Sequence, residues 1–153
     1  MITPALEFVF AAEAQLADPI PIGNTPQGTR RIIPILSGRF EGPAIRGTFV
    51  PEGAADWQFT RSDGVTQAEA TYALRTDDGV IIQVQNFGLR HGPDAVMKRL
   101  AAGEDVDPHS YYFRTTPRFS APEGRYDWLN KHLFVASGAR SRNGIRLWFF
   151  TIT

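Results

Sequence analysis

The sequence predicts an all-β fold, either an antiparallel barrel or a two-sheet sandwich. Fourteen glycines and eleven prolines divide its 153 residues into short segments rich in β-branched and aromatic residues, which is typical of strands. Asp-Gly and Asn-Gly turns separate many of these segments, and such turns join antiparallel neighbours. Polar residues at alternating positions of two strands favour the barrel.

Nine strands are predicted, and turn signals separate them. In chain order they are Ala5–Gln15, Arg30–Phe40, Ala44–Val50, Asp56–Thr60, Gln67–Arg75, Val80–Phe87, Tyr111–Arg118, Leu133–Arg140 and Arg146–Ile152. Ser62-Asp63-Gly64, Asp77-Asp78-Gly79 and Arg142-Asn143-Gly144 predict hairpin turns, because Asp, Asn and Gly tolerate positive φ. Residues 19–26 contain three prolines and predict a long loop.

One short helix is predicted near residues 93–102. Pro93 suits its first turn, Lys98 and Arg99 lie near the negative end of its dipole, and Gly103 suits the position after its last turn. The remaining elements are strands, so we expect one barrel domain of about eight to nine strands over residues 1–153.

Alternation along two strands favours a barrel that holds a ligand. In Gln67–Arg75 one face is apolar and small and the other is mostly polar. In Val80–Phe87, Gln83 and Gln85 share one face and Asn86 lies on the other. A fully packed core would exclude such polar residues, whereas a ligand cavity uses them.

Composition excludes several classes of function. Sixteen basic and sixteen acidic residues cancel, so no overall field favours nucleic acid or a membrane surface. The absence of cysteine excludes disulfides, thiolate catalysis and cysteine-ligated metals. No signal-like segment is recognisable, so we expect a cytoplasmic protein.

Asp56 is the first candidate for chemistry. A carboxylate beside the indole of Trp57 is costly to bury, and such acids often have perturbed pKa values. Asp56 would then act as a general acid or base, or accept a hydrogen bond from a substrate hydroxyl. The alternative is structural: Asp56 caps backbone N–H groups after Gly53, and Trp57 fills the core.

Two arginines are predicted to join Asp56 at one end of the barrel. The guanidinium of Arg31 or Arg114 would pair with Asp56 or bind a ligand carboxylate or phenolate. If Arg114 points inward, alternation places Tyr112 on the same wall. The alternative for each arginine is a structural ion pair or a place on the surface.

Aromatic and amide side chains are predicted to line the pocket, where they would stack on a flat ligand and orient its oxygens. These candidates are Trp57, Tyr72, Asn86, Trp128, Asn130 and His132. Ordinary barrel core is the alternative, with Trp128 anchoring a loop and His132 making a loop hydrogen bond.

Other motifs are lacking. His91, His109 and His132 form no HxH or HExxH pair, so we expect no metal site and no cofactor. The glycines between Gly38 and Gly47 lack the lysine of a phosphate loop and are interpreted as strand bends. No serine stands in a nucleophile elbow.

A set of short motifs extends over almost the whole chain. They are Arg31 before Ile32-Ile33-Pro34-Ile35, Gly38, Gly42-Pro43, Gly47, Gly53, Ala55-Asp56-Trp57-Gln58, Asp63-Gly64, Tyr72, Thr76-Asp77-Asp78-Gly79, Asn86, Tyr112-Phe113-Arg114-Thr115, Pro117-Arg118-Phe119, Tyr126, Trp128-Leu129-Asn130 and Ala136. Together they resemble the DUF3237 family, also called UPF0311. The resemblance implies a calycin-like antiparallel β-barrel, often oligomeric, and it implies no agreed activity.

The expected function is small-molecule binding inside the barrel. The favoured hypothesis is a cofactor-independent isomerase, cyclase, lyase or hydratase acting on a small aromatic or carbonyl-bearing metabolite. Asp56 would transfer the proton, Arg31 or Arg114 would stabilise negative charge, and Tyr112 and Asn86 would orient the substrate. The alternatives are a non-catalytic, lipocalin-like carrier and an oligomeric scaffold filled by its own side chains. Because Leu147-Trp148-Phe149-Phe150 is apolar on both faces, it predicts a subunit interface.

Overall fold

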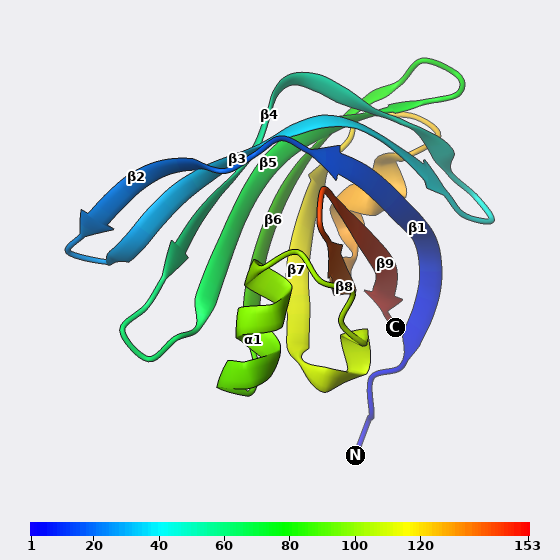
Figure 1. The fold of residues 1–153 in the computed structure, drawn as a ribbon. Helices are drawn as coiled ribbons and strands as arrows, with labels where there is room; N and C mark the ends of the chain where they lie inside the picture. Colours follow the sequence, from blue (N-terminus) through cyan, green and yellow to red (C-terminus); the bar gives the residue numbers. More distant parts are fainter.

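The chain forms a closed eight-stranded antiparallel β-barrel with one additional strand, as seen in a computed structural model that describes residues 1–153 (Figure 1). The strands are β1 (Leu6–Leu16), β2 (Ile20–Thr25), β3 (Gly28–Glu41), β4 (Arg46–Thr60), β5 (Thr66–Thr76), β6 (Ile81–His91), β7 (Tyr112–Ser120), β8 (Leu133–Ser141) and β9 (Gly144–Ile152). One α-helix, α1 (Asp94–Ala101), and two 3₁₀ turns, η1 (Pro108–Ser110) and η2 (Asp127–Lys131), complete the fold.

The barrel closes through β1. From β3 to β9 each strand pairs with the next strand along the chain, and β9 pairs with β1. β1 also pairs with the second half of β3, from Ala11↔Glu41 to Leu16↔Ile35. The first half of β3 pairs with β2 instead. β3 therefore belongs to the ring at one end and extends beyond it at the other.

Two elements differ from the sequence prediction. The segments Ala44–Val50 and Asp56–Thr60 form one long strand, β4, because an irregularity between Val50 and Ala55 absorbs the Pro51–Gly53 stretch without ending the strand. Residues 20–25, expected to be a loop, form β2. β2 pairs only with β3, and an edge strand tolerates proline because half of its N–H groups need no partner.

Aromatic packing fills one end of the barrel. The ring centroids of Phe10 and Phe149 are 4.3 Å apart, those of Phe10 and Phe40 are 5.3 Å apart, and those of Phe119 and Phe134 are 4.9 Å apart. All five rings are buried. The segment around η2 covers this end, where Leu129 and Tyr126 are buried against the same core.

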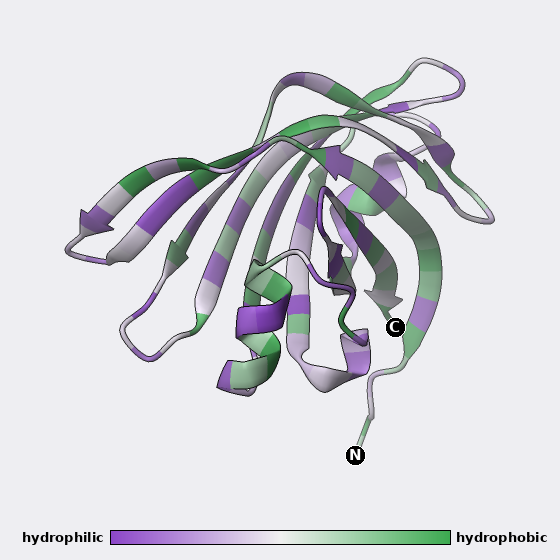
Figure 2. Ribbon diagram, viewed as in Figure 1, coloured by the Kyte–Doolittle hydropathy of each residue, from purple (hydrophilic) through white to green (hydrophobic).

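The other end opens beside α1. The predicted helix is confirmed, and none of its residues is fully buried. It rests with Val96, Met97 and Leu100 on a small satellite cluster that includes Tyr111 and Phe113. Figure 2 shows polar and apolar residues alternating along the strands and mixed on α1. None of the helices has the length and apolar character needed to span a membrane.

Close approach of neighbouring strands requires glycine at position 47. Gly47 lies opposite Thr76 in the β4–β5 pair. A Cβ at Gly47 would overlap the carbonyl oxygen of Arg75 and lie 2.8 Å from the Cα of Thr76. Both atoms belong to the backbone, so no side-chain rotation relieves the contact. Gly47 therefore allows the backbones of β4 and β5 to approach closely.

We predict that Gly47→Ala lowers the free energy of unfolding by about 3 kcal/mol, because β5 must move away from β4. Urea unfolding measures this change. Gly64→Asn is the matched control: Gly64 has φ +84° with open space around it, and asparagine tolerates that conformation. Equal stability of the two variants would contradict the proposed close approach.

Candidate functional site

Charged and amide side chains gather inside the open end of the barrel. Arg31 comes from β3, Asp56 and Gln58 from β4, Arg90 from β6 and Arg140 from β8. Asp56 and Gln58 are two residues apart and therefore point to the same side of their strand. The structure thus brings Arg31 and Asp56 to the same end of the barrel, as the sequence predicted.

Asp56 is the acceptor at the end of a hydrogen-bond chain. Arg31 donates from Nε and Nη2 to Oε1 of Gln58, at 3.1 and 2.9 Å. Gln58 donates from Nε2 to Oδ2 of Asp56 at 2.6 Å, and the backbone N–H of Glu69 donates to Oδ1 at 2.8 Å. Because a guanidinium can only donate, it fixes which way the Gln58 amide points. Both contacts therefore suit the ionised carboxylate of Asp56.

Burial and hydrogen bonding act on Asp56 in opposite directions. Burial raises the pKa of its carboxyl, while the bonds from Gln58 and Glu69 and the charges of Arg90 and Arg140 lower it. The net pKa lies above the usual aspartate value. Asp56 therefore keeps its proton to a higher pH than an exposed aspartate does.

Arg90 is buried without a hydrogen-bonding partner. It is 7% exposed, and its Nε has no acceptor. Its guanidinium lies 5.6 Å from the ring centroid of Phe113. Burial, followed by repulsion from Arg140 and Arg31, lowers the pKa of Arg90 to about 10. The site therefore holds cations that lower one another's pKa.

Two neighbouring spaces lie around this cluster. The mouth is a cleft of about 530 Å³ whose walls include Arg31 and Arg90 together with residues of α1. Beneath it is a cavity of about 40 Å³ whose walls include Asp56. Arg140 and Leu16 line both spaces, so they mark the boundary between them.

Unpartnered polar atoms line the inner cavity. They are the hydroxyls of Tyr72 and Thr115 and Oδ1 of Asn86. Burial raises the pKa of Tyr72, so its hydroxyl keeps its proton. The cavity has room for about two or three waters or for a small substituent of a ligand. Tyr72 and Asn86 lie where the sequence analysis expected pocket residues.

The expected inward placement of Arg114 and Tyr112 is wrong. The inward residues of β7 include Phe113 and Thr115, so the residues between them face outward. Tyr112 is 43% exposed. Arg114 donates to the backbone oxygen of Phe113 at 2.9 Å and lies 5.4 Å from the ring centroid of Tyr112.

The expected pocket positions of four other residues are also wrong. Trp57 is 46% exposed, because its neighbour Asp56 takes the inward position. Trp128 packs on Phe134 at the closed end, with ring centroids 6.2 Å apart. Asn130 exchanges hydrogen bonds with the backbone of Ala121 at 2.8 and 2.9 Å. Nδ1 of His132 lies 2.8 Å from the backbone oxygen of Trp128. The placements of Trp128 and His132 match the structural alternatives given for them.

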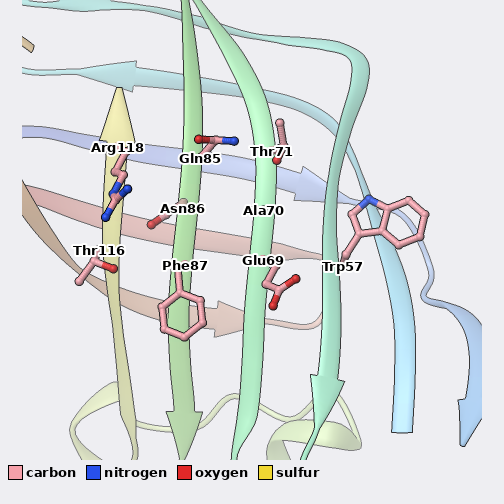
Figure 3. A pocket seen from close by; sticks show the side chains of 9 residues that line it. All are labelled: Trp57, Glu69, Ala70, Thr71, Gln85, Asn86, Phe87, Thr116 and Arg118. Carbon is pink, nitrogen blue, oxygen red and sulfur yellow. The ribbon is translucent and has the colours of Figure 1, made fainter. Parts of the chain in front are cut away.

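A separate hollow of about 540 Å³ lies on the outer face of β4–β7. Figure 3 shows its side chains, including Trp57, Glu69, Phe87 and Arg118, carried by adjacent strands. Glu69 and Arg118 are exposed. The charged side chains of this hollow are therefore solvated, whereas those of the barrel interior are largely buried.

Sequence reasoning missed Gln58, Arg90 and Arg140. The predicted strand ended at Phe87, three residues before Arg90, although Arg90 shares the face of Asn86 when β6 is extended to His91. Arg140 ended the predicted strand Leu133–Arg140 and was not named as a site residue, but β8 continues to Ser141 and carries Arg140 inward with Ala136. The alternation of inward and outward residues along each strand was the signal that could identify these side chains. Its use depended on where each predicted strand ended.

Comparison with known proteins identifies the family. The profile of the family described as "Protein of unknown function (DUF3237)" matches residues 4–152. A UPF0311 protein of Rhodopseudomonas palustris is 45% identical over 141 residues, which cover 91% of this chain and 92% of the relative.

Solved structures show the same architecture. A conserved protein of unknown function from Rhodopseudomonas palustris matches with a TM-score of 0.95 and 38% identity, over 100% of both chains. A beta-barrel like protein from Acinetobacter baumannii matches with a TM-score of 0.86 and 37% identity, over 100% of this chain and 98% of the other. An enzyme from Penicillium herquei, at 19% identity and a TM-score of 0.74 over 100% and 97% of the chains, shares the fold. This chain belongs to the DUF3237 family.

Proposed function

We propose that this protein is a cofactor-independent enzyme that transfers a proton within a small carbonyl-bearing or aromatic metabolite bound in the barrel. The observation that carries the proposal is Asp56: a carboxylate with a raised pKa, held by the Arg31–Gln58 chain at the wall of a cavity. Acids of this kind, placed in concave sites, are typical of acid–base catalysis.

The roles follow from position. Asp56 would accept a proton from a carbon or hydroxyl of the substrate and return it to another atom of the same molecule. Arg140, at the boundary between cavity and mouth, would stabilise the oxyanion that forms meanwhile. The free acceptor of Asn86 and the hydroxyl of Tyr72 would orient the reacting end. Proton removal and return balance, so the cycle needs no oxidant or reductant.

The size of the spaces supports a small metabolite. The mouth lies within the range of pockets that bind small molecules. The fold shared with an enzyme from Penicillium herquei supports only the statement that such a barrel can form part of an enzyme. A carrier would use the same spaces but would leave its ligand chemically unchanged.

We predict that Asp56→Asn abolishes turnover, lowering it at least ~100-fold, because the variant lacks the proton acceptor. Small molecules extracted from cells that produce the protein are incubated with wild-type or variant protein and compared by chromatography and mass spectrometry. Wild-type protein should convert at least one compound into an isomer of the same mass.

Asp63→Asn is the matched control, since Asp63 lies in an exposed turn, pairs with Arg61 and lines neither the inner cavity nor the mouth. The control should act like wild type. Conversion by Asp56→Asn at the wild-type rate would refute the role of Asp56. A ligand that binds and is recovered unchanged from wild-type protein would indicate a carrier.

The raised pKa of Asp56 predicts how stability depends on pH. Between the unfolded pKa, near 3.8, and the higher folded value, the folded protein binds more protons than the unfolded chain. Its free energy of unfolding therefore falls as pH rises through this window. The difference in free energy of unfolding between wild type and Asp56→Asn should fall in the same way and then level off. The total fall should be about 1.4 kcal/mol for each unit by which folding raises the pKa.

Urea unfolding from pH 3.5 to 8 measures this difference. Asp63→Asn again serves as the control, because hydrogen bonds from Arg61 lower the pKa of Asp63 to about 2. The difference in free energy of unfolding between wild type and Asp63→Asn should instead rise with pH at the acidic end of this range and stay constant at higher pH. A wild-type advantage over Asp56→Asn that grows with pH would show that the pKa of Asp56 is lowered.

We further propose that the protein is a homo-oligomer that pairs through the outer face of β1, β9 and β8. Strand alternation corrects the expected interface: Leu147 and Phe149 face the core, and Trp148 and Phe150 face outward. Phe150 contacts Phe8, with ring centroids 5.9 Å apart. Phe8 is 47% exposed and Leu133 72% exposed on the same face. Exposed apolar patches of this kind mark interfaces.

We predict that Phe150→Glu yields a monomer, because a charge would be buried at the interface. Light scattering coupled to size-exclusion chromatography measures the mass. Phe87→Glu is the matched control, since Phe87 is an exposed aromatic residue on the outer hollow of β4–β7. Dissociation by Phe87→Glu alone would move the interface to that hollow, and a monomeric wild type would refute oligomerisation.

A further inference from the structure

The open end of the barrel carries more positive than negative charge. Arg31, Arg90 and Arg140 face it, and Asp56 is the only carboxylate that the hydrogen-bond chain brings to them. At the rim, the exposed Asp18 and Arg142 offset each other. Two positive charges therefore remain unmatched even when Asp56 is ionised.

The arginines differ in what they can still bind. Arg31 uses Nε and Nη2 on Gln58 and keeps Nη1. Arg90 makes no side-chain hydrogen bond or ion pair, and its buried Nε is unpartnered. Burying such a donor costs free energy unless something accepts from it. Both residues line the mouth and not the inner cavity, whereas Arg140 lines both.

We propose that Arg90 and Arg31 bind a permanent carboxylate of the substrate in the mouth, while the reacting end of the same molecule reaches Asp56 and Arg140. This inference rests on the proposed function for the site and names its substrate class: a carboxylic acid with an apolar or aromatic body. The two unmatched positive charges are then offset by the carboxylate and by the oxyanion that forms during proton transfer.

The surroundings favour a carboxylate over a phosphate. Leu16, Met97 and Leu100 line the same mouth and suit an apolar body next to the anion. The C-terminal part of α1, from Met97 to Ala101, borders the mouth. That end of a helix carries partial negative charge, which disfavours a dianion. Planar carboxylates also match the fork geometry of guanidinium groups.

Thermal unfolding with small probes tests the proposal. Acetate, benzoate and phenylacetate, each up to ~50 mM at constant ionic strength, are compared with benzamide and inorganic phosphate. We expect benzoate or phenylacetate to raise Tm in a saturable way that benzamide does not reproduce. An equal effect of benzamide, a larger effect of phosphate, or no effect of any of the three carboxylates would overturn the proposal.

Variants locate the effect. Arg90→Met should weaken benzoate binding at least tenfold. Without probe, its Tm should equal that of wild type or lie about 2–4 °C higher, because the repulsion among the arginines is relieved and the methionine keeps the packing on Phe113. Arg114→Met is the matched control on the outer face and should bind benzoate as wild type does. Unchanged benzoate binding by Arg90→Met would refute the assignment.

Asp56→Asn separates this inference from the proposed function. It should bind benzoate as tightly as wild type or more tightly, because it removes a negative charge near the arginines. Carboxylate binding lost in Arg90→Met, together with turnover retained in Asp56→Asn, would uphold the anion site and refute the catalytic role. Loss of turnover in Asp56→Asn, together with equal effects of benzoate and benzamide on wild type, would uphold the catalytic role and refute the anion site.

Discussion

Closure of the sheet is the constraint on which the rest of this molecule depends. Once β1 pairs with β3, alternate residues of each strand in the ring must point into a shared interior. Phenylalanines fill that interior at one end, and η2 covers it. The same alternation at the other end directs arginines, Asp56 and amides inward, around a cleft and a small cavity. One geometric rule thus produces both a solid core and a polar, open site.

The two ends carry opposite energetic consequences. Stacked Phe10 and Phe149 gain from burial and from aromatic contact. Arg90, buried and unpartnered, opposes folding, and its like-charged neighbours add to that cost. The packed end therefore offsets the strain of the polar end. Such a distribution is typical of proteins whose binding sites are kept at the expense of stability.

Sequence reasoning predicted the interior better than the ends of strands. The all-β class, the helix, Asp56, Arg31, Tyr72 and Asn86 were placed well, because turn signals and alternation are local properties. Arg114 and Arg90 show the limit. Arg114 faces outward because Phe113 and Thr115 take the inward positions of β7, and Arg90 lay beyond the predicted end of its strand at Phe87 although β6 continues to His91. β2 shows another limit, since its prolines are tolerated only because tertiary pairing leaves it at an edge.

The direction of the hydrogen-bond chain links the fold to the chemistry. Arg31 lies opposite Gln58 in the β3–β4 pair, and Asp56 follows on the same face of β4. Because arginine can only donate, the chain can run only toward Asp56. A proton arriving on Asp56 must weaken that chain, whereas a carboxylate arriving beside Arg31 competes for its remaining donor. In the proposed mechanism, substrate binding and protonation of Asp56 would therefore be coupled through Gln58, the one side chain that hydrogen-bonds to both Arg31 and Asp56.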